Sequence, residues 1–339
     1  MQGSHDLWRS LHHSAFARTK VLVTGGAGFI GSHLAAALAG LGATVVALDD
    51  LSGGGDGDFG WLGAEAITGD ISLIRGSILD KSLLERATAD CRYVFHQAAL
   101  GSVPGSIAEP VRYYDVNCTG TMNVLEAARA AGVQRIMFAA SASAYGSSEV
   151  LPKVETMSAE PISPYAATKV AGEAFLRAYS ASYGQLDTVA LRYFNIFGPR
   201  QNANSAYAAA IAAFATAALS GKSPTIFGDG EQSRDFTHVD NVVHANLLAA
   251  RSERPIRGEV INVATGQRVT VNQLVAEVIT FCRDPNLRPT HAPERAGDVR
   301  HSLADIERAK QWLGYAPIVD FRTGLTETLR WYAQQRRPR

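Results

Sequence analysis

The chain contains 339 residues, of which 46% are hydrophobic and 19% are charged, and its formal net charge is +0 at pH 7. This length allows a large core in one or two domains, and the balanced charge argues against a nucleic-acid partner. The three cysteines are scattered and the first twenty residues lack the apolar segment of a signal peptide, so we expect a cytoplasmic protein without disulfides, metal ligands or membrane contact.

The first strong pattern is the stretch from Val21 to Leu34, VLVTGGAGFIGSHL. It predicts a buried strand, a tight turn and a helix that begins near Phe29. Gly25, Gly28 and Gly31 recur at every third position, which permits the turn, close approach of a ligand to the backbone and close packing of helix on strand. A dinucleotide pyrophosphate would then lie against free N–H groups at the helix N-terminus.

A carboxylate follows the second predicted strand, which covers Thr44 to Leu48. Asp49 stands at roughly the offset of ~20 residues that is typical of a residue binding the adenosine ribose. Its negative charge favours NAD over NADP, because a 2′-phosphate would be repelled there.

Strands and helices alternate further along the chain. The predicted strands cover 73–75, 92–95, 135–139 and 188–192, and the predicted helices cover 83–89, a segment from about 116, and 163–183. This alternation indicates an α/β fold, a doubly wound parallel sheet (Rossmann) with a smaller C-terminal substrate-binding lobe. We place the NAD-binding domain at 1–194 plus about 236–264, and the second lobe at about 195–235 and 265–339.

Two segments outside this alternation are also predicted to be helical. Residues 1–19 form an N-terminal extension in which Leu7, Trp8 and Leu11 belong to a short docking helix. The alanine-rich run from Ala206 to Leu219 is too short to cross a bilayer and is predicted to be a buried helix.

Tyr165 and Lys169, in the segment YAATK, form the pattern that carries chemistry. Residues four apart share a helix face, so the two side chains point the same way. A nearby ammonium favours the phenolate and would make Tyr165 a usable base, while Ser141, at the end of a predicted strand, would hydrogen-bond the same substrate hydroxyl. Taken alone, YxxxK is also an ordinary helix-surface pair; beside a dinucleotide fingerprint it favours a catalytic site.

These segments resemble the extended short-chain dehydrogenase/reductases over nearly the whole chain from Lys20. TGGAGFIG matches the family's glycine-rich turn, HQAA its central strand, and SASAYG with YAATK its catalytic Ser and YxxxK. RYFNIFGPRQ, GDGEQSRDFTHVDN and ERAGDVRHSLADI match the segments that shape a nucleotide-sugar pocket. Within the family the chain is most similar to bacterial UDP-N-acetylhexosamine 4-epimerases.

The resemblance implies a role for each matching residue. Tyr165 takes the proton of the C4 hydroxyl, Lys169 lowers the pKa of Tyr165 and holds the nicotinamide ribose, and Ser141, with Ser143 as a helper, binds the C4 oxygen. The implied contacts to NAD are Gly25, Gly28, Phe29, Ile30, Asp49, Ser77, Ile78, Gln97, Ala99, Tyr165, Lys169 and Tyr193. The implied contacts to the UDP-sugar are Ser141, Ser143, Asn195, Arg234, Arg295, Asp298 and Ser302.

The implied activity is NAD-dependent C4 epimerisation of a UDP-N-acetylhexosamine (UDP-GlcNAc/UDP-GalNAc or their uronic acids) through a 4-keto intermediate. Two neighbouring alternatives are a UDP-glucose/UDP-galactose 4-epimerase and a UDP-glucuronate 4-epimerase. An alternative of another class is a non-catalytic NAD-binding sensor of the same fold. A 4,6-dehydratase is disfavoured, because Ala142 and Ser143 stand where those enzymes place Asp and Glu.

Ser302 has two interpretations. In related epimerases the matching residue of the pocket wall is bulky when only UDP-glucose and UDP-galactose are accepted, so a small Ser leaves room for an N-acetyl group. Alternatively, Ser302 only caps a helix that begins at Leu303, because Ser is a favourable N-cap residue.

The resemblance also implies a homodimer. The helices around 116–131 and 163–183 would pair across a two-fold axis, and the apolar Val124, Leu125, Ala174 and Phe175 would face the partner. The same four residues are alternatively part of the core.

Overall fold

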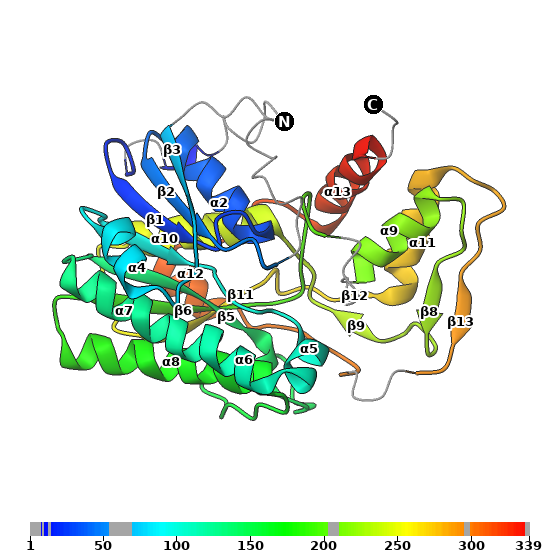
Figure 1. Cartoon of the computed structure of the whole chain (residues 1–339). Coiled ribbons are helices and arrows are strands. Elements are labelled where there is room, and N and C mark those ends of the chain that lie inside the picture. The colour runs from blue at the N-terminus through cyan, green and yellow to red at the C-terminus, as the bar shows by residue number, and fades with distance from the viewer. Residues whose placement is uncertain are drawn as a thin grey trace.

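A seven-stranded sheet is the centre of the larger of two lobes in the computed structural model, which describes residues 8, 10–12, 15–53, 70–202, 210–294 and 299–335 (Figure 1). Its strand order is β11-β6-β5-β4-β1-β2-β3, and every neighbouring pair is parallel. The order reverses direction between β1 and β4, which is the doubly wound arrangement predicted from the sequence. The strands are β1 (Lys20–Thr24), β2 (Thr44–Asp49), β3 (Asp70–Arg75), β4 (Tyr93–His96), β5 (Arg135–Ser141), β6 (Asp187–Tyr193) and β11 (Glu259–Val263).

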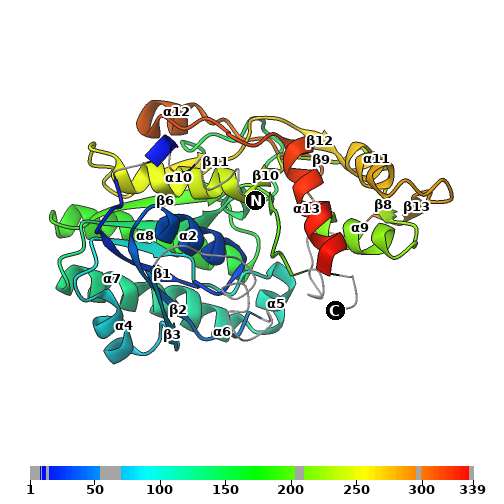
Figure 2. The ribbon, with the colours of Figure 1, turned by 90° about the horizontal axis from the view of Figure 1, so that it is seen from above.

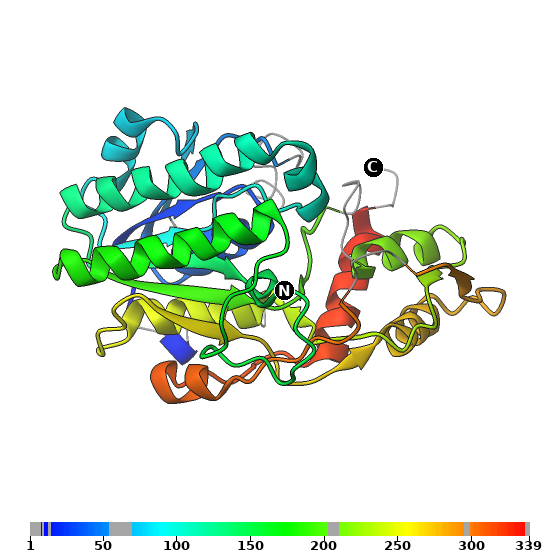
Figure 3. The same cartoon turned by 90° about the horizontal axis from the view of Figure 1, so that it is seen from below.

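Helices cover both faces of this sheet, so its inner strands are apolar on both sides. On one face lie α4 (Lys81–Thr88), α7 (Gly120–Ala130) and α8 (Pro164–Ser182), which Figure 3 shows side by side. The other face carries α2 (Phe29–Gly40) and α10 (Val239–Arg251). None of the helices in the described residues has the length and hydropathy that a bilayer crossing requires.

Short helical segments connect β4 to α7 and β5 to α8 at the edge of the sheet where the parallel strands end. They are α5 (Val103–Ala108), α6 (Pro110–Tyr114), the π-helical turn η1 (Asp115–Thr119) and the 3₁₀ turn η2 (Ala142–Tyr145). The predicted helix from about 116 therefore begins as a π turn before it continues as α7.

The smaller lobe has its own apolar core, formed mainly by three helices and the short strands beside them. Figure 1 shows it beside the larger lobe, with α9, α11 and α13 grouped together. The predicted alanine-rich helix is present as α9, although residues 206–209 lie outside the described residues. The elements are β7 (Ile196–Phe197), α9 (Ala210–Leu219), β8 (Thr225–Phe227), β9 (Ser233–Arg234), β10 (Thr237–His238), β12 (Val269–Thr270), α11 (Val271–Cys282), β13 (Thr290–Ala292) and α13 (Phe321–Gln335).

One helix departs from the predicted division of the chain. Helix α12 (Glu307–Leu313) lies beside α10 and β11, as Figures 1 and 2 show, although its residues fall in the range assigned to the second lobe. Ala309, Leu313 and Tyr315 are buried in the core of the larger lobe. The chain therefore returns to the larger lobe once more, after residue 265, because these apolar residues are buried there. The alternation of strands and helices in the sequence does not predict this second return.

The predicted dimer residues require a correction. Val124 and Leu125 of α7 have exposed fractions of 0% and 1%, and they pack in the core between helices and sheet. They are therefore core residues, not surface residues that face a partner. On α8, Ala174 is exposed and Phe175 is half-buried.

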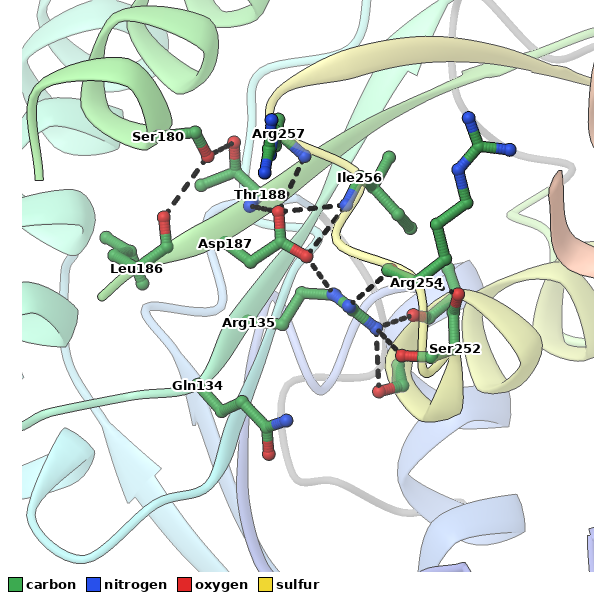
Figure 4. A network of polar contacts seen from close by, with 12 residues as sticks. Gln134, Arg135, Ser180, Leu186, Asp187, Thr188, Ser252, Arg254, Ile256 and Arg257 are labelled. Carbon is green, nitrogen blue, oxygen red and sulfur yellow. Dashed lines mark hydrogen bonds and ion pairs between the residues drawn. The ribbon is translucent and has the colours of Figure 1, made fainter. Parts of the chain in front are cut away.

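Arg135 joins the amino-terminal edge of the sheet to the end of α10 (Figure 4). Its Nε donates to the carboxylate of Asp187 at 2.7 Å, and its Nη1 donates to the carbonyl oxygens of Ala249 and Ser252 at 2.6 and 2.8 Å. A helix ends with carbonyl groups that lack intrahelical partners, and a guanidinium supplies donors and positive charge to them. This buried pair fixes α10 on the sheet, remote from the carboxyl ends of the strands.

The N-terminal extension docks on α10 through aromatic side chains. Trp8 and His12 are buried, and the ring of His12 makes a 3.0 Å hydrogen bond to the ring of His244. Residues 8 and 10–12 are helical, in agreement with the predicted docking helix, whereas Leu7 lies outside the described residues. Burial lowers the pKa of His12 to about 3 and that of His244 to about 4, so both rings are neutral at pH 7.

Low pH should therefore weaken the packing of His12 against His244 and lower the stability of the protein. Because the folded-state pKa values lie below the ordinary 6.5, the unfolded chain binds more protons, and stability falls as pH drops from 6.5 toward 4. Replacing the pair, His12→Leu with His244→Leu, should make the decline of Tm over this pH range shallower than in the wild type. The exposed His291→Leu is the control and should keep the wild-type slope. An unchanged slope in the double variant would contradict the assignment.

Candidate active site

The glycine-rich turn after β1 is built as a cradle at the carboxyl edge of the sheet. Gly25 has φ +68°, and a Cβ there would come within 2.7 Å of the Ala98 nitrogen. A Cβ on Gly31 would collide with the Gly25 carbonyl oxygen, which keeps α2 close to the turn. Glycine suits both positions: Gly25 has a left-handed backbone, and neither Gly25 nor Gly31 has room for a Cβ atom.

The N-terminus of α2 offers unpartnered backbone donors above this turn. Gly28 is the N-cap and supplies no side-chain cap, and the first turn of α2 contains no acidic residue. The first helical hydrogen bond runs from Ser32 N to Gly28 O at 2.9 Å, and Gly28 N itself donates to Gly25 O at 3.1 Å. The N–H groups of Phe29 and Ile30, in the first turn of the helix, are therefore left to an external acceptor. This donor set fits the pyrophosphate of a dinucleotide.

Asp49 lies at the end of β2, next to the turn. Its carboxylate accepts hydrogen bonds from Ala27 N at 2.9 Å and from Leu51 N at 2.8 Å. Burial raises the pKa of Asp49, and these backbone donors partly offset the increase. The carboxylate is thus fixed beside the cradle, where a ribose hydroxyl would be its remaining partner.

The residues predicted to flank adenine lie after β3. The Ser77 hydroxyl accepts from Leu79 N at 3.2 Å and shapes the turn before α4. The Ile78 side chain is buried against Gly120, so only its backbone remains for a contact with a ligand. Its carbonyl oxygen already accepts from Asn123 Nδ2 at 3.2 Å.

Three polar side chains link the ends of β4 and β6 to α10. The Tyr193 hydroxyl accepts from Asn246 Nδ2 at 2.8 Å and donates to Gln97 Oε1 at 3.2 Å. Burial raises the pKa of Tyr193 to about 12, so this phenol stays neutral. Ala99 is half-buried on the same segment as Gln97. The network holds Gln97 and Tyr193 in place at the sheet edge predicted to bind nicotinamide.

Ser141, Tyr165 and Lys169 meet at the end of β5. Ser141 ends β5, pairs in register with Tyr193 and accepts hydrogen bonds from both the amide and the hydroxyl of Ser143, at 3.2 and 2.9 Å. With its lone pairs occupied, the Ser141 hydroxyl is free to donate, and it forms a hydrogen bond with Tyr165. Only β4 separates β5 from β1, so the trio and the glycine-rich turn share one edge of the sheet.

Burial is the largest influence on the ionisable groups of this trio. Burial raises the pKa of Tyr165, and the hydrogen bond with Ser141 reverses only part of the increase. The ammonium of Lys169 donates to the Ala139 carbonyl oxygen at 2.8 Å and lies 5.9 Å from the centre of the Tyr165 ring. The predicted lowering of the phenol's pKa by Lys169 therefore stays a prediction, and in this structure burial is the largest influence on Tyr165.

The substrate side of the site comes from segments far apart in the sequence. Asn195 adopts φ +40° and donates from Nδ2 to the Asp235 carbonyl oxygen at 3.1 Å. Arg234 lies in β9, which pairs with the segment carrying Ser302, since Ser302 N donates to Ser233 O at 2.9 Å. The structure thus brings Arg234 and Ser302 together, whereas Arg295 and Asp298 lie outside the described residues.

The capping interpretation of Ser302 is wrong. No helix begins at Leu303; Ala304 makes a parallel bridge with Lys153, and the next helix, α12, starts at Glu307. Backbone pairing on both sides, with residues 233 and 153, holds this segment extended. Ser302 lies five residues before α12 and resembles a helix cap in the sequence alone. The strand-like pairing that replaces the cap depends on residues 153 and 233, which are remote along the chain.

Asp235 is the organising residue that the sequence interpretation missed. Its fully buried carboxylate accepts from Thr265 N and Oγ1 at 2.9 and 2.7 Å, from Gly266 N at 3.0 Å and from Ala304 N at 3.3 Å. It therefore locks the Arg234 and Ser302 segments to the loop after β11. The acidic residue directly before the segment FTHV, which contains no Asp, Glu, Lys or Arg, was the available signal.

A metal ligand set was not predicted, yet the fold places His238, Asp240 and Glu327 with one potential ligand atom each within 4.8 Å of one another. The ring of His238 accepts from the Asp240 amide through Nδ1 at 3.4 Å. This bond puts the ring proton on Nε2, which takes that nitrogen out of the ligand set. The cluster is better explained as a helix cap at the start of α10.

Comparison with known proteins agrees with this geometry. The model of the family described as "NAD dependent epimerase/dehydratase family" matches residues 21–264. The chain belongs to this family. Like its other members it is an NAD-dependent enzyme, and similar proteins include UDP-sugar 4-epimerases, which are isomerases.

Three similar proteins bear on the site. A putative UDP-glucose 4-epimerase of Methanocaldococcus jannaschii is 35% identical over 94% of this chain and 99% of its own length. A solved UDP-N-acetylglucosamine 4-epimerase from Methanobrevibacter ruminantium, in complex with UDP-N-acetylmuramic acid, is 39% identical with a TM-score of 0.85, covering 94% of this chain and all 100% of that one. The Thermus thermophilus UDP-glucose 4-epimerase in complex with NAD is 35% identical with a TM-score of 0.80, covering 93% and 99%.

Proposed function

We propose that the chain interconverts UDP-N-acetylglucosamine and UDP-N-acetylgalactosamine, or their uronic acids, by epimerisation at C4. The observation that carries the proposal is the shared sheet edge, where Ser141 and Tyr165 lie two strands from a dinucleotide cradle. The family and the 4-epimerases among its similar proteins support this reaction class. UDP-glucose and UDP-glucuronate remain the alternative substrates.

The residues of this chain have distinct tasks in the reaction. Oxidised NAD, when bound, supplies a positively charged ring that accepts the C4 hydride and returns it. Tyr165 takes the proton of the C4 hydroxyl and later gives it back, so a neutral phenol and a phenolate alternate at one oxygen. Ser141 is oriented by the two donors of Ser143 and has a single proton to donate. When the substrate binds, this proton turns from Tyr165 to the sugar oxygen that becomes a carbonyl.

Holding the dinucleotide falls to the residues of the cradle. The amides at the start of α2, including those of Phe29 and Ile30, face the pyrophosphate, and Asp49 accepts from the adenosine ribose. The Lys169 ammonium binds the nicotinamide ribose and adds positive charge near Tyr165. Gln97, Ala99 and Tyr193 line the nicotinamide side, and Ser77 and Ile78 the adenine side, the latter through backbone.

Holding the nucleotide sugar falls to the junction of the two lobes. Arg234 and Arg295 bind the diphosphate, because a planar guanidinium matches phosphate oxygens, and Asp298 binds the uridine ribose. Asn195 contacts the sugar from the end of β6. While the diphosphate and the uridine stay bound, the 4-keto sugar rotates and presents its other face.

Ser302 supports an N-acetylated sugar over a plain hexose. It is part of an extended segment beside Arg234 and has no capping task to explain a Ser there. A small side chain leaves space for the acetamido group at C2.

Enlarging this residue should therefore change the choice of substrate. Ser302→Tyr should lower kcat/KM for UDP-GlcNAc by at least about tenfold while kcat/KM for UDP-glucose changes by less than about threefold, since one badly placed group in a pocket costs about 1–3 kcal/mol. Initial rates with the two UDP-sugars measure the ratio, and Ser302→Ala is the matched control. An equal loss on both substrates would show that the residue supports structure only.

Product analysis of the NAD-loaded enzyme with a panel of UDP-sugars tests the proposal as a whole. UDP-GlcNAc should yield UDP-GalNAc, with UDP-glucose and UDP-glucuronate converted more slowly. Faster turnover of UDP-glucose or of UDP-glucuronate would replace the proposed substrate by one of the alternatives. No turnover of any of them would favour the non-catalytic NAD-binding sensor.

We also propose a homodimer in the cytoplasm. Ile107, Val111 and Tyr114 are 67%, 72% and 59% exposed on α5 and α6, which pack beside α8. With Ala174 and Phe175 they supply the apolar contact that the inward-facing Val124 and Leu125 do not. The location is supported by three free thiols, Cys91, Cys118 and Cys282.

A further inference from the structure

The ammonium of Lys169 is held in a nearly closed, weakly polar environment. The residue is 4% exposed, Nζ donates to the Ala139 carbonyl oxygen at 2.8 Å, and it lies 5.0 Å from the centre of the Phe138 ring. Among the described residues no carboxylate forms an ion pair with it. Burial lowers the pKa of Lys169 to about 8, so the charge that the reaction needs is close to being lost at physiological pH.

A buried carboxylate lies one helical turn further along α8. Residues 165, 169 and 173 are each four apart, so Glu173 shares the helix face of Tyr165 and Lys169. Glu173 is 7% exposed, and both of its oxygens accept from Arg192, from Nε at 2.8 Å and from Nη2 at 2.7 Å. This two-point contact fixes the position of the carboxylate.

Arg192 in turn connects this pair to the catalytic turn. Its guanidinium lies 4.5 Å from the centre of the Tyr145 ring, at the end of η2, and the Tyr145 hydroxyl donates to Asn262 Oδ1 at 2.7 Å. The turn η2 starts directly after Ser141 and contains Ser143. The ion pair thus touches both the helix that carries Tyr165 and Lys169 and the turn that orients Ser141.

Stability alone is a poor reason for a buried ion pair, because desolvation of both charges offsets most of their attraction. The position of this pair supplies a better reason. The Glu173 carboxylate raises the pKa of Lys169 and opposes the effect of burial, and it does so from a site with little solvent to screen it.

We infer that Glu173, held by Arg192, is a positioning residue that keeps the Lys169 ammonium charged and in place; this inference rests on the proposed function of Lys169. Other ionisable groups also face this site from the packed elements. They are His96 of β4, Tyr113 of α6, Cys118 of η1, Tyr145 of η2 and Tyr165 of α8. None of these five groups is a carboxylic acid, and burial raises the pKa of Cys118, Tyr145 and Tyr165, which favours their neutral forms.

The test is a titration of Lys169 itself in the NAD-loaded protein. The chain has six lysines, so the ε-carbon signals in NMR spectra of ¹³C-lysine-labelled protein are few, and Lys169→Arg assigns the one of interest. Glu173→Gln keeps the size and one acceptor for Arg192 but removes the charge. It should lower the titration midpoint of Lys169 by about one pH unit, and the alkaline limb of kcat/KM should move down by the same amount. Glu173→Asp should restore part of the shift.

A buried ion pair on the same strand provides the control. Asp187 and Arg135 pair at the opposite end of β6 and β5 (Figure 4). Asp187→Asn should lower Tm but leave both the Lys169 midpoint and the alkaline limb unchanged. Glu173→Gln leaves a buried guanidinium without a carboxylate opposite it. If this variant folds poorly, the double variant Glu173→Gln with Arg192→Met removes both charges. It should still lower the midpoint of Lys169, but by less than the single variant, because loss of the Arg192 cation favours the ammonium.

Folded variants in which Lys169 titrates as in the wild type, with a uniform loss of activity at every pH, would overturn the inference and leave Glu173 with a structural role. Failure of the proposed function gives a different result. In that case wild-type protein loaded with NAD epimerises no UDP-sugar, while the NMR titration still decides whether Glu173 controls the charge of Lys169.

Discussion

Replacing Tyr165 by phenylalanine is expected to lower kcat for C4 epimerisation by about 10²–10⁴-fold, the usual contribution of a positioned general base. The variant loses one oxygen at the end of the Ser141 hydrogen bond and no apolar contact. Binding of NAD and of the UDP-sugar should change little, because the cradle and Arg234 are untouched. Initial rates, with calorimetry for ligand binding, measure both quantities.

A second tyrosine on α8 serves as the control. Tyr179→Phe removes a hydroxyl that donates to Glu126 at 2.6 Å. Tyr179 lies on the same helix as Tyr165 but several turns away from it. It should retain wild-type kcat, so a loss in Tyr165→Phe cannot be attributed to the helix. Retention of more than a tenth of the activity by Tyr165→Phe would rule out this phenol as the base.

Removing the carboxylate of Asp235 should have the largest effect on stability. Asp235→Ala removes a fully buried carboxylate and leaves the amides of Thr265, Gly266 and Ala304 without this acceptor, and the free energy of unfolding should fall by about 3 kcal/mol. KM for the UDP-sugar should rise as well, since the Arg234 and Ser302 segments depend on these bonds. Denaturant unfolding and initial rates of the same preparation test both.

Asp229→Ala is the matched control in the same part of the chain. Asp229 is half-exposed and pairs with the exposed Arg300, so its loss should leave the free energy of unfolding close to that of the wild type. If Asp235→Ala were no less stable than Asp229→Ala, the carboxylate would not be the centre of the lobe junction.

Local signals in the sequence were sufficient for the sheet and for one half of the site. The run VLVTGGAGFIG determines β1, the turn and the start of α2 through short-range sterics, and spacing alone places Tyr165 and Lys169 on one face of α8. Because parallel strands end at one edge, the order of β1, β4 and β5 then brings these residues together.

Features that depend on remote partners were not predictable in this way. The strand-like pairing around Ser302 needs residues 153 and 233, and the return of α12 to the larger lobe needs α10 and β11. Val124 and Leu125 point inward because α7 packs against α4 and the sheet, and these are contacts between remote segments. Likewise, the raised pKa of Tyr165 follows from burial, which the helical spacing of Lys169 does not reveal.

Glu173 and Arg192 illustrate the same limit within the site. The spacing YxxxKxxxE puts Glu173 on the face of Lys169, and this signal was available in the sequence. Its meaning depends on Arg192, which reaches it from β6, and on the burial of both side chains. Only the folded chain shows that the carboxylate lies where it can hold an ammonium charged.

Transfer of the C4 hydrogen tests the central claim most directly. NAD-loaded enzyme is incubated in ordinary water with UDP-GlcNAc that carries deuterium at C4, and the product is examined by NMR and mass spectrometry. If the hydrogen leaves C4 and returns to the same carbon on the opposite face, UDP-GalNAc should retain the deuterium at C4, with no net accumulation of reduced cofactor. Product with solvent hydrogen at C4, or stoichiometric growth of the NADH absorbance band, would contradict the account.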